Sequence, residues 1–310
     1  KDNTYVGDTT IAGGTLQLGN GGTTGKILGN VNTGADANNN GTLVFDMSSN
    51  PVFAGTISGF GNVEQSGSDA LTLKGTNTYS GGTTINSGTL AVSADANMGD
   101  TSGSLTIKNG TLQNTAQFTM DRDVVVGDAG ATFQNDADLT LAGNMTGTTD
   151  WSKDGSGKLI INGDASAATG TASVNNGYLQ VDNELGGNVN LVNSTAGVGG
   201  AGKIDGNVDV ASGTLYGKGG QTLTIGGDLT LAANSTTSVQ WGSVSQQAAF
   251  HVDGSLTMDG TLNVVDTGGF GSGTYKLFTY DGTLTDDGLS FGTVPGGQAA
   301  KDRMSVVTAY

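Results

Sequence analysis

One phrase occurs twice in this 310-residue chain, and this repetition limits the possible folds more than any other feature. Residues 4–16 read TYVGDTTIAGGTL and residues 78–90 read TYSGGTTINSGTL, with nine of thirteen positions identical. Repeated units of this kind fold as an array in which each unit packs against its neighbours. The sequence therefore predicts a fold that grows by stacking.

Shorter echoes of the phrase, of the form Gly-x-Leu, recur along the whole chain. Most intervals between their glycines are whole multiples of roughly 22 or 23 residues, an interval typical of one turn of a solenoid. Only the intervals from Gly14 to Gly41 and from Gly177 to Gly213 do not fit. The echoes begin at Gly14, Gly41, Gly88, Gly110, Gly177, Gly213, Gly260 and Gly282.

Between these echoes lie short segments in which two apolar residues flank one polar residue, as in residues 71–73 and 139–141. This alternation predicts short strands with one buried face. The 55 glycines would each cost a helix about 1 kcal/mol, so helix is nearly excluded. We expect an all-β chain, a right-handed parallel β-helix with a C-terminal capping region. The alternative is an array of β-sandwich domains.

The charge and composition exclude several classes of function. The formal net charge is −16, from 28 acidic and 12 basic residues, and no cluster of Lys or Arg is present. Such a surface repels phosphate backbones and anionic headgroups, so we expect no nucleic-acid partner and no direct membrane insertion. The chain has no cysteine, which excludes disulfides, thiolate catalysis and Cys-type metal sites.

Residues 71–90, LTLKGTNTYSGGTTINSGTL, resemble the passenger-associated repeat of Gram-negative autotransporters, the proteins of type V secretion. A degraded copy of the repeat runs through residues 151–179. Residues 254–266 and 273–282 resemble the C-terminal passenger region that is called the autochaperone. The resemblance covers most of the chain and implies a β-helical passenger domain.

The resemblance also implies a location and a domain organisation. An autotransporter passenger is exported through the periplasm and the outer membrane, and is then displayed on the cell surface or secreted, often with a role in virulence. Its partner in export is the C-terminal outer-membrane barrel of its own precursor. We recognise neither this barrel nor a signal peptide here, so we expect a segment of a longer precursor. Residues 1–235 are expected to form the repeat coils, and residues 236–310 the C-terminal coils and the autochaperone-like cap.

Aromatic residues are concentrated near the C-terminus, where eight of the chain's eighteen lie within the last seventy positions. Each can bury about 150 to 250 Å², so this end is expected to be stable and to act as a folding nucleus on which other coils add. The alternative is a plain cap that protects the last strands from edge pairing. The expected nucleus or cap residues are Trp241, Tyr275, Leu277, Phe278 and Tyr280. Other aromatics of this region are Phe250, Phe270, Phe291 and Tyr310.

Alternation along residues 273–282 divides these side chains between two faces. We expect Tyr275, Leu277 and Thr279 to face the interior of the coil. Lys276, Phe278 and Tyr280 then lie on the opposite face and cover the outside or a capping hairpin.

The sequence offers few groups for nucleophilic catalysis or cofactor binding. His251 is the only histidine, and we expect it to be a surface or structural residue and not part of a catalytic triad. Residues 197–203 mimic the start of a phosphate-binding loop, but Ile204 replaces the required Ser or Thr and no helix follows. We therefore expect no cofactor.

Paired carboxylates are the remaining candidates for catalysis, because β-helices also carry polysaccharide lyases and hydrolases. Such enzymes need Lys or Arg beside the acids, and only Arg122 is near any pair. Residues 199–205 approach a calcium-binding repeat, but the Asp arrives one residue late, which turns its side chain to the other face. We expect no metal site. The pairs are Asp121 with Asp123, Asp136 with Asp138, and Asp286 with Asp287.

Three classes of function follow. The first is a non-enzymatic adhesive or self-associating passenger, or its stalk, whose partners are host-cell or matrix molecules or the same protein on neighbouring cells. The alternative is a carbohydrate-active enzyme on a β-helix scaffold. A third class is a surface that orders water through aligned Thr-x-Thr pairs, and the sequence predicts that the Thr positions drift between coils. Because no site stands out, the adhesive interpretation depends on analogy.

Overall fold

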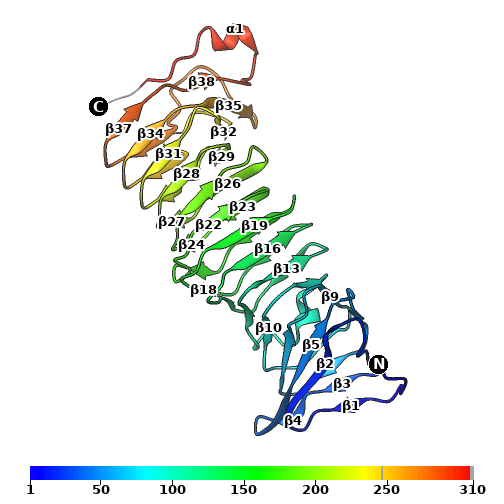
Figure 1. The fold of residues 1–310 in the computed structure, drawn as a ribbon. Helices are drawn as coiled ribbons and strands as arrows, with labels where there is room; N and C mark the ends of the chain where they lie inside the picture. Colours follow the sequence, from blue (N-terminus) through cyan, green and yellow to red (C-terminus); the bar gives the residue numbers. More distant parts are fainter. Residues whose placement is uncertain (246, 308–310) are drawn as a thin grey trace. The chain divides into compact units, whose positions relative to one another are not determined.

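The computed structural model describes residues 1–245 and 247–307, so the expected contribution of Tyr310 lies outside the described residues. The chain divides into two compact units, Lys1–Gly170 and Thr171–Tyr310. Each unit is a solenoid in which parallel strands stack on the strands of the preceding turn (Figure 1). The prediction of an all-β parallel β-helix is confirmed. The expected boundary between residues 235 and 236 concerns folding behaviour and stays a prediction.

In the first unit, the strands stack in four parallel sheets among the described residues. The sheets, each in stacking order, are β1 (Thr9–Thr10), β3 (Val31–Asn32), β7 (Ile57–Ser58); β2 (Gly14–Gly22), β5 (Asn39–Met47), β8 (Asn62–Gln65), β10 (Thr83–Ile85), β12 (Leu105–Ile107), β15 (Val124–Val126), β18 (Met145–Thr146); β6 (Val52–Phe53), β9 (Ala70–Leu73), β11 (Thr89–Val92), β13 (Gly110–Asn114), β16 (Ala131–Asn135), β19 (Trp151–Asp154); and β14 (Phe118–Met120), β17 (Leu139–Leu141), β20 (Lys158–Ile161). The short strand β4 (Gly34–Asp36) pairs antiparallel with β5, and β21 (Asp164–Ala165) closes the unit's strand order.

In the second unit, the described strands form three parallel sheets. In stacking order they are β22 (Ala172–Val174), β25 (Val189–Leu191), β28 (Val208–Val210), β31 (Leu229–Leu231), β34 (Leu256–Met258), β37 (Leu284–Asp286); β23 (Gly177–Val181), β26 (Ala196–Gly200), β29 (Gly213–Lys218), β32 (Ser235–Trp241), β35 (Thr261–Asp266), β38 (Ser290–Phe291); and β24 (Glu184–Leu185), β27 (Lys203–Ile204), β30 (Leu223–Ile225), β33 (Phe250–Val252), β36 (Phe278–Tyr280).

Helix is confined to two short segments of the described chain. They are a 3₁₀ turn, η1 (Asp95–Met98), and α1 (Gln298–Lys301). Among the described residues, no helix is long and apolar enough to span a membrane. The near absence of helix agrees with the high glycine content and with the period-two pattern of the sequence.

The length of one rung, meaning one turn of the solenoid, varies along the chain. Ala172 pairs with Val189, whereas Leu256 pairs with Leu284, which is a much longer step along the sequence. Individual rungs therefore depart in both directions from the expected roughly 22 or 23 residues per solenoid turn, because loops of different length connect strands that stay in register. The interval from Gly14 to Gly41 that did not fit this period is a single rung, since these two glycines pair.

The three-residue strands confirm the expected alternation. In β12, β17 and β30 the first and third side chains are buried, whereas the middle one is partly exposed. Because the register is kept from rung to rung, buried side chains stack in columns, as Leu105 does on Val124 and Val124 on Met145. Each column removes apolar surface from water at roughly 25 cal/mol per Å². No rung can bury its apolar residues alone.

Asn and Asp side chains join successive rungs at one corner of the second unit. The side-chain oxygen of Asn188 accepts a hydrogen bond from the backbone N–H of Asn207, at 2.8 Å. Asn207 does the same for Asp228, at 2.8 Å, and Asp228 for Ser255, at 2.7 Å. Gly227 precedes Asp228, and a Cβ atom there would overlap the Asn207 oxygen. The recurring Gly-Asn and Gly-Asp pairs of the sequence therefore serve a structural function.

The two copies of the repeated phrase form the same local hydrogen bond. The hydroxyl of Tyr5 lies 2.8 Å from that of Thr9, and the hydroxyl of Tyr79 lies 2.6 Å from that of Thr83. Their burial differs, however, because Tyr5 is 44% exposed whereas Tyr79 is 0% exposed. The ring of Tyr79 lies against Gly99, in the segment that follows η1. The phrase therefore encodes the local bond, and the neighbouring segment provides the burial.

Arg122 is the largest of the fully buried side chains. It lies between β14 and β15, and its Nε donates to Asp95 Oδ1 at 2.7 Å. Its two terminal nitrogens donate to backbone carbonyls of the loop between β11 and β12, so one side chain satisfies most of that loop's inward acceptors. The carbonyls belong to Asp95, Met98, Gly99, Asp100 and Gly103.

We expect Arg122→Ala to lower the free energy of unfolding by about 3 to 5 kcal/mol, because it leaves Asp95 without its ion pair and removes the donor that Arg122 supplies to the loop carbonyls. The measurement is the midpoint of urea denaturation. Arg303→Ala is the matched control, because exposed Arg303 makes a single hydrogen bond to Ala299, and its midpoint should equal that of the parent. Equal midpoints for both variants would contradict the structural function of Arg122.

Candidate functional site

The aromatic residues expected at the C-terminal end form two groups in the second unit. The ring of Trp241 is stacked on that of Phe270, with centroids 6.4 Å apart, and lies 5.0 Å from that of Tyr275. The ring of Phe250 is stacked on that of Phe278 at 5.2 Å. Trp241 and Phe250 are buried, 5% and 0% exposed respectively. The structure thus brings five aromatic residues of this region into ring contact, and Tyr280 and Phe291 are not among them.

The expected division of faces along residues 277–280 is wrong. Phe278 pairs with Phe250, and Tyr280 pairs with Val252, so both follow buried, inward-facing residues. Thr279 instead pairs with His251 on the outer face. The strand was assigned to the wrong face because alternation fixes which residues share a face, but not which face is inside. Leu277 precedes the strand and is half-buried.

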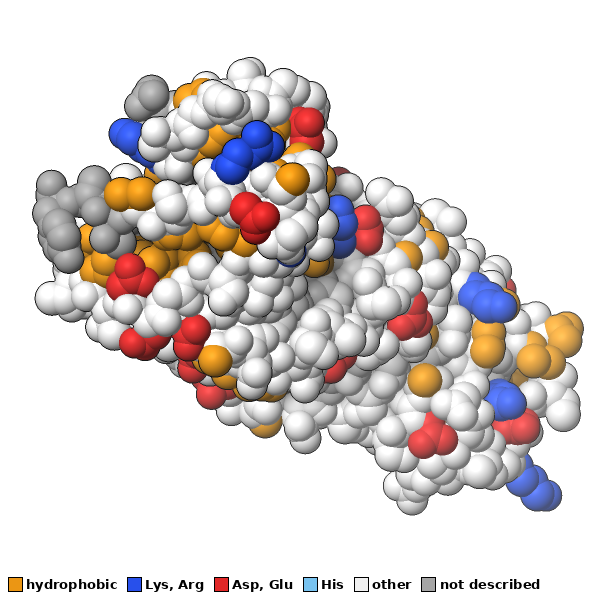
Figure 2. Space-filling view, turned by 90° about the horizontal axis from the view of Figure 1, so that it is seen from above, with side chains coloured by type: hydrophobic (Ala, Val, Ile, Leu, Met, Phe, Trp, Pro, Cys, Tyr) orange, Lys and Arg blue, Asp and Glu red, His pale blue; other side chains and the backbone are white. Residues whose placement is uncertain are grey.

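The last described rung has apolar side chains on its inner face that are only partly covered. Phe278, Tyr280, Leu284 and Phe291 are all half-buried, whereas their partners in the preceding rung are buried or nearly so. Figure 2 views this end of the second unit, and hydrophobic side chains are visible there. In a solenoid, each rung is covered by the rung that follows it. These side chains pack on the preceding rung, with which their strands pair.

Hydroxyl side chains are aligned along the outer face of the sheet that contains β29, β32, β35 and β38. Each pairs in register with the next, and we call the four residues the hydroxyl ladder. The prediction that the Thr positions drift is wrong, because the rung length varies while the register does not. The adjacent outer column holds Tyr216, Ser238 and Asn263, so the ladder is one Thr column wide. The ladder comprises Thr214, Thr236, Thr261 and Ser290.

The face of the molecule that Figure 2 shows is mostly polar and uncharged. In Figure 2, most visible atoms belong to the backbone and to uncharged polar side chains, and the acidic side chains are scattered among them. Related columns run along other faces, such as Thr230, Thr257 and Thr285 in the second unit. Such columns repeat a donor and an acceptor about every 4.8 Å, the spacing of adjacent strands.

The candidate acid pairs are tied into the solenoid. Asp123 accepts a hydrogen bond from the backbone of Asn144 at 2.9 Å, and Asp138 accepts one from the backbone of Lys158 at 3.0 Å. Asp136 accepts from the side chains of Gln113 and Gln134. These carboxylates therefore act as structural acceptors.

Two cations near the acid pairs, Arg122 and Lys153, are turned into the core. Arg122 is 1% exposed and bound to Asp95, so it is not available to a sugar. Lys153, which is near Asp138, is 0% exposed, and burial lowers its pKa to about 8. Its ammonium group donates to the backbone carbonyls of Asp154 and Gly155. Asp286 accepts a backbone bond within its own turn, from Gly288 at 3.1 Å.

The two overlapping glycine-rich motifs in residues 197–205 are strand segments. Residues 196–200 form β26, and Lys203 follows in β27, so no helix N-terminus is available to bind a phosphate. Asp205 is engaged by Lys203, with Nζ and Oδ1 2.6 Å apart. The interpretation that the phosphate-loop match is accidental agrees with this arrangement.

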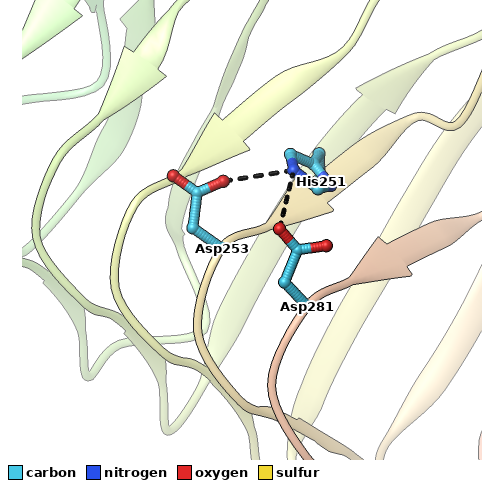
Figure 3. A group of neighbouring side chains, drawn as sticks. All are labelled: His251, Asp253 and Asp281. Carbon is cyan, nitrogen blue, oxygen red and sulfur yellow. Dashed lines mark ion pairs between the residues drawn. The ribbon is translucent and has the colours of Figure 1, made fainter.

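A cluster that the sequence analysis did not predict lies on the outer face of β33 and β36 (Figure 3). Nε2 of His251 lies 3.1 Å from Oδ1 of Asp253 and 3.9 Å from Oδ2 of Asp281. Potential ligand atoms of the three residues all lie within 4.8 Å of one another. The pattern His-x-Asp is visible in the sequence, but Asp281 is distant from it along the chain, and only the length of this rung brings it alongside.

Comparisons with known proteins agree with the solenoid. The passenger-associated-transport-repeat family matches residues 2–18, 63–92 and 152–181. An adhesin named BmaC autotransporter, from Brucella suis biovar 1 (strain 1330), is 38% identical over 137 residues. This match covers 44% of the chain and 4% of that relative's length. No solved structure matches.

The matched residues include both copies of the repeated phrase and the degraded copy in residues 151–179. The family resemblance, the parallel β-solenoid and the related adhesin are consistent with one another. The chain thus carries the passenger-associated transport repeat in three places and resembles part of an autotransporter adhesin, which supports a passenger segment that is located on the cell surface of a Gram-negative bacterium or secreted by it.

Proposed function

We propose that this segment is a non-enzymatic adhesive part of its passenger and that the hydroxyl ladder makes the contact. The observation that carries the proposal is the in-register alignment of Thr214, Thr236, Thr261 and Ser290 on one outer face. The related adhesin supports the same class of function. The partner is a surface or matrix molecule of a host, or the same protein on a neighbouring cell.

An aligned ladder suits a partner that is itself repetitive. Hydroxyl groups both donate and accept hydrogen bonds, so each rung offers the same contact at a fixed spacing. A single net hydrogen bond contributes only about 1 kcal/mol, and several in a row are needed for stable adhesion. The net charge of −16 repels a second copy at long range, so self-association should strengthen as salt screens it.

The environment of the acid pairs supports a non-enzymatic function. Asp123, Asp136 and Asp138 are acceptors within the solenoid, and Arg122 is buried. A polysaccharide-cleaving site needs a cation that can reach the sugar and an acid that is free to move a proton. Neither Arg122 nor these three carboxylates meet those conditions.

We further propose that the C-terminal region, residues 236–310, promotes folding of the passenger during secretion, and that Trp241, Tyr275, Leu277, Phe278 and Tyr280 belong to its nucleus. Ring contacts support this proposal, because Trp241 joins Phe270 and Tyr275 into one cluster within this region. In a solenoid, a stable rung is a template on which the neighbouring rung pairs.

Adhesion assays test the hydroxyl ladder. Replacing Thr214, Thr236 and Thr261 together by Ala removes three hydroxyls without changing the charge, so cell aggregation or host-cell binding should weaken roughly 10- to 100-fold. The matched control replaces the same residues by Ser and keeps the hydroxyls. Binding should be measured for bacteria displaying each variant at low and high salt. Equal adhesion by the Ala variant and the parent would show that the ladder is not the contact.

Incubation with polysaccharides tests the enzymatic alternative, which predicts that the polysaccharides are cleaved. Purified protein incubated with pectin-like and alginate-like polysaccharides should leave their chain length unchanged, because the candidate acids are structural. Reproducible cleavage that is abolished by Asp136→Ala or Asp286→Ala would replace the adhesive hypothesis by an enzymatic one.

Refolding kinetics test the C-terminal nucleus. Trp241→Leu removes a buried ring from the cluster, and we expect it to slow refolding about 10-fold or more. Such a decrease in rate corresponds to a loss of about 1.4 kcal/mol or more of stabilisation in the folding transition state. Leu141→Ala, at a buried position of the first unit, should mainly accelerate unfolding. Stopped-flow fluorescence in urea measures both limbs. A parent-like refolding rate for Trp241→Leu would leave the region as a cap only.

A further inference from the structure

The geometry points to a divalent-cation site of the zinc class formed by His251, Asp253 and Asp281 on the outer face of the second unit. This site was not expected from the sequence and does not depend on the proposed adhesive function. His251 is central in β33, Asp253 follows that strand, and Asp281 follows β36 in the next rung. Three potential ligand atoms from two rungs thus meet in one place.

The hydrogen bonds around His251 indicate which of its nitrogens is available. Nδ1 lies 3.0 Å from the hydroxyl oxygen of Thr279. That hydroxyl donates its own proton to the backbone carbonyl of Phe250, at 3.4 Å. A proton on Nδ1 would satisfy this contact and leave Nε2 free to bind a metal ion. A histidine that binds a metal is oriented by this kind of second bond.

In this tautomer the lone pair of Nε2 faces two carboxylates. Oxygen atoms of Asp253 and Asp281 lie 3.1 and 3.9 Å from Nε2, so in this tautomer three lone pairs converge. Three converging lone pairs repel each other unless a cation lies between them. A proton on Nε2 or a metal ion can fill this place, and the convergence of three ligand atoms from two rungs is the geometry on which we propose the metal.

Neighbouring charges do not occupy the cluster. Lys203 lies on the same outer column, two rungs from His251 through Thr224. Its ammonium group is paired with Asp205 at 2.6 Å. Asp253 and Asp281 make their ion pairs with His251 among the described residues. The carboxylates are 41% and 71% exposed, so an ion can reach them directly from solvent.

The donor set identifies the class of ion. Zn²⁺ binds imidazole nitrogen and carboxylate oxygen at about 2.0 to 2.2 Å, which sets ligand atoms roughly 3.3 Å apart in a tetrahedron. The separations of up to 4.8 Å require rotation of the two exposed carboxylates towards His251. Three protein ligands leave one position for water. Ca²⁺ and Mg²⁺ prefer oxygen ligands only, so the imidazole selects against them.

A bound ion would add a connection between two rungs that are already joined by strand pairing, by the stacked rings of Phe250 and Phe278 and by the contact of His251 with Thr279. Asp281 belongs to the last rung, whose inner side chains are only partly covered. Linking it to His251 and Asp253 holds this rung on the preceding one. Because the ion binds the folded chain, the ion stabilises the folded state by mass action. The site therefore makes the stability of the C-terminal rungs depend on a divalent cation.

Calorimetric titration of the whole untagged chain with Zn²⁺ tests the site. The parent should bind about one equivalent, and both His251→Gln and Asp281→Asn should bind at least 10-fold more weakly. Asp209→Asn is the matched control, because it removes an exposed carboxylate from β28, and its affinity should equal the parent's. Zn²⁺ should raise the melting temperature of the parent and of Asp209→Asn, but not that of His251→Gln.

Three results would overturn the assignment. The first is no binding by the parent at 1 mM Zn²⁺, which would leave a proton as the occupant. The second is equal Zn²⁺ affinity for the parent and His251→Gln, which would place the ion elsewhere. The third is binding of Ca²⁺ as tight as that of Zn²⁺ and insensitive to His251→Gln, which would indicate a carboxylate-only site.

Discussion

In-register parallel pairing of each rung with the next is the interaction on which both units depend. It satisfies the backbone of short strands that could not exist alone, and it stacks like side chains into columns. Apolar columns such as Leu105, Val124 and Met145 form the core. Polar columns such as Thr236 and Thr261 form the outer face. The same constraint therefore produces the core, the adhesive surface that we propose, and the cation cluster.

Strand pairing fixes the register of the strands but not the length of the loops that connect them. The contacts that distinguish one rung from another therefore involve loop residues. The loop between β11 and β12 contains η1 and is held by Arg122 from the following rung. Longer rungs towards the C-terminus carry Phe270 and Tyr275 to the ring of Trp241. Loop length also determines which carboxylate arrives beside His251. Function in such a solenoid is thus added at the corners without disturbing the strands.

The fold was predictable from the sequence because its signals are local. Two apolar residues around one polar residue define the three-residue strands, and Gly with Asn or Asp marks one corner of the second unit, where Asn207 and Gly227 explain the pattern. The resemblance to the passenger-associated repeat was also carried by contiguous motifs, and the family model matches these. Features that join different rungs were not predictable. The aligned hydroxyl ladder was mistaken for drifting Thr positions, because its members are separated by unequal intervals.

The two copies of the repeated phrase show which features depend on the local sequence and which depend on the tertiary structure. By itself the sequence determined the short strands, their turns and the bond from the Tyr5 or Tyr79 hydroxyl to the nearby Thr of the same phrase, because these involve neighbours along the chain. Only the tertiary structure decided that Tyr79 is buried under the segment after η1, that Phe278 faces inward, and that Asp281 lies beside His251. Alternation is symmetric between the two faces of a strand. Which face is inside depends on the rung that packs against it.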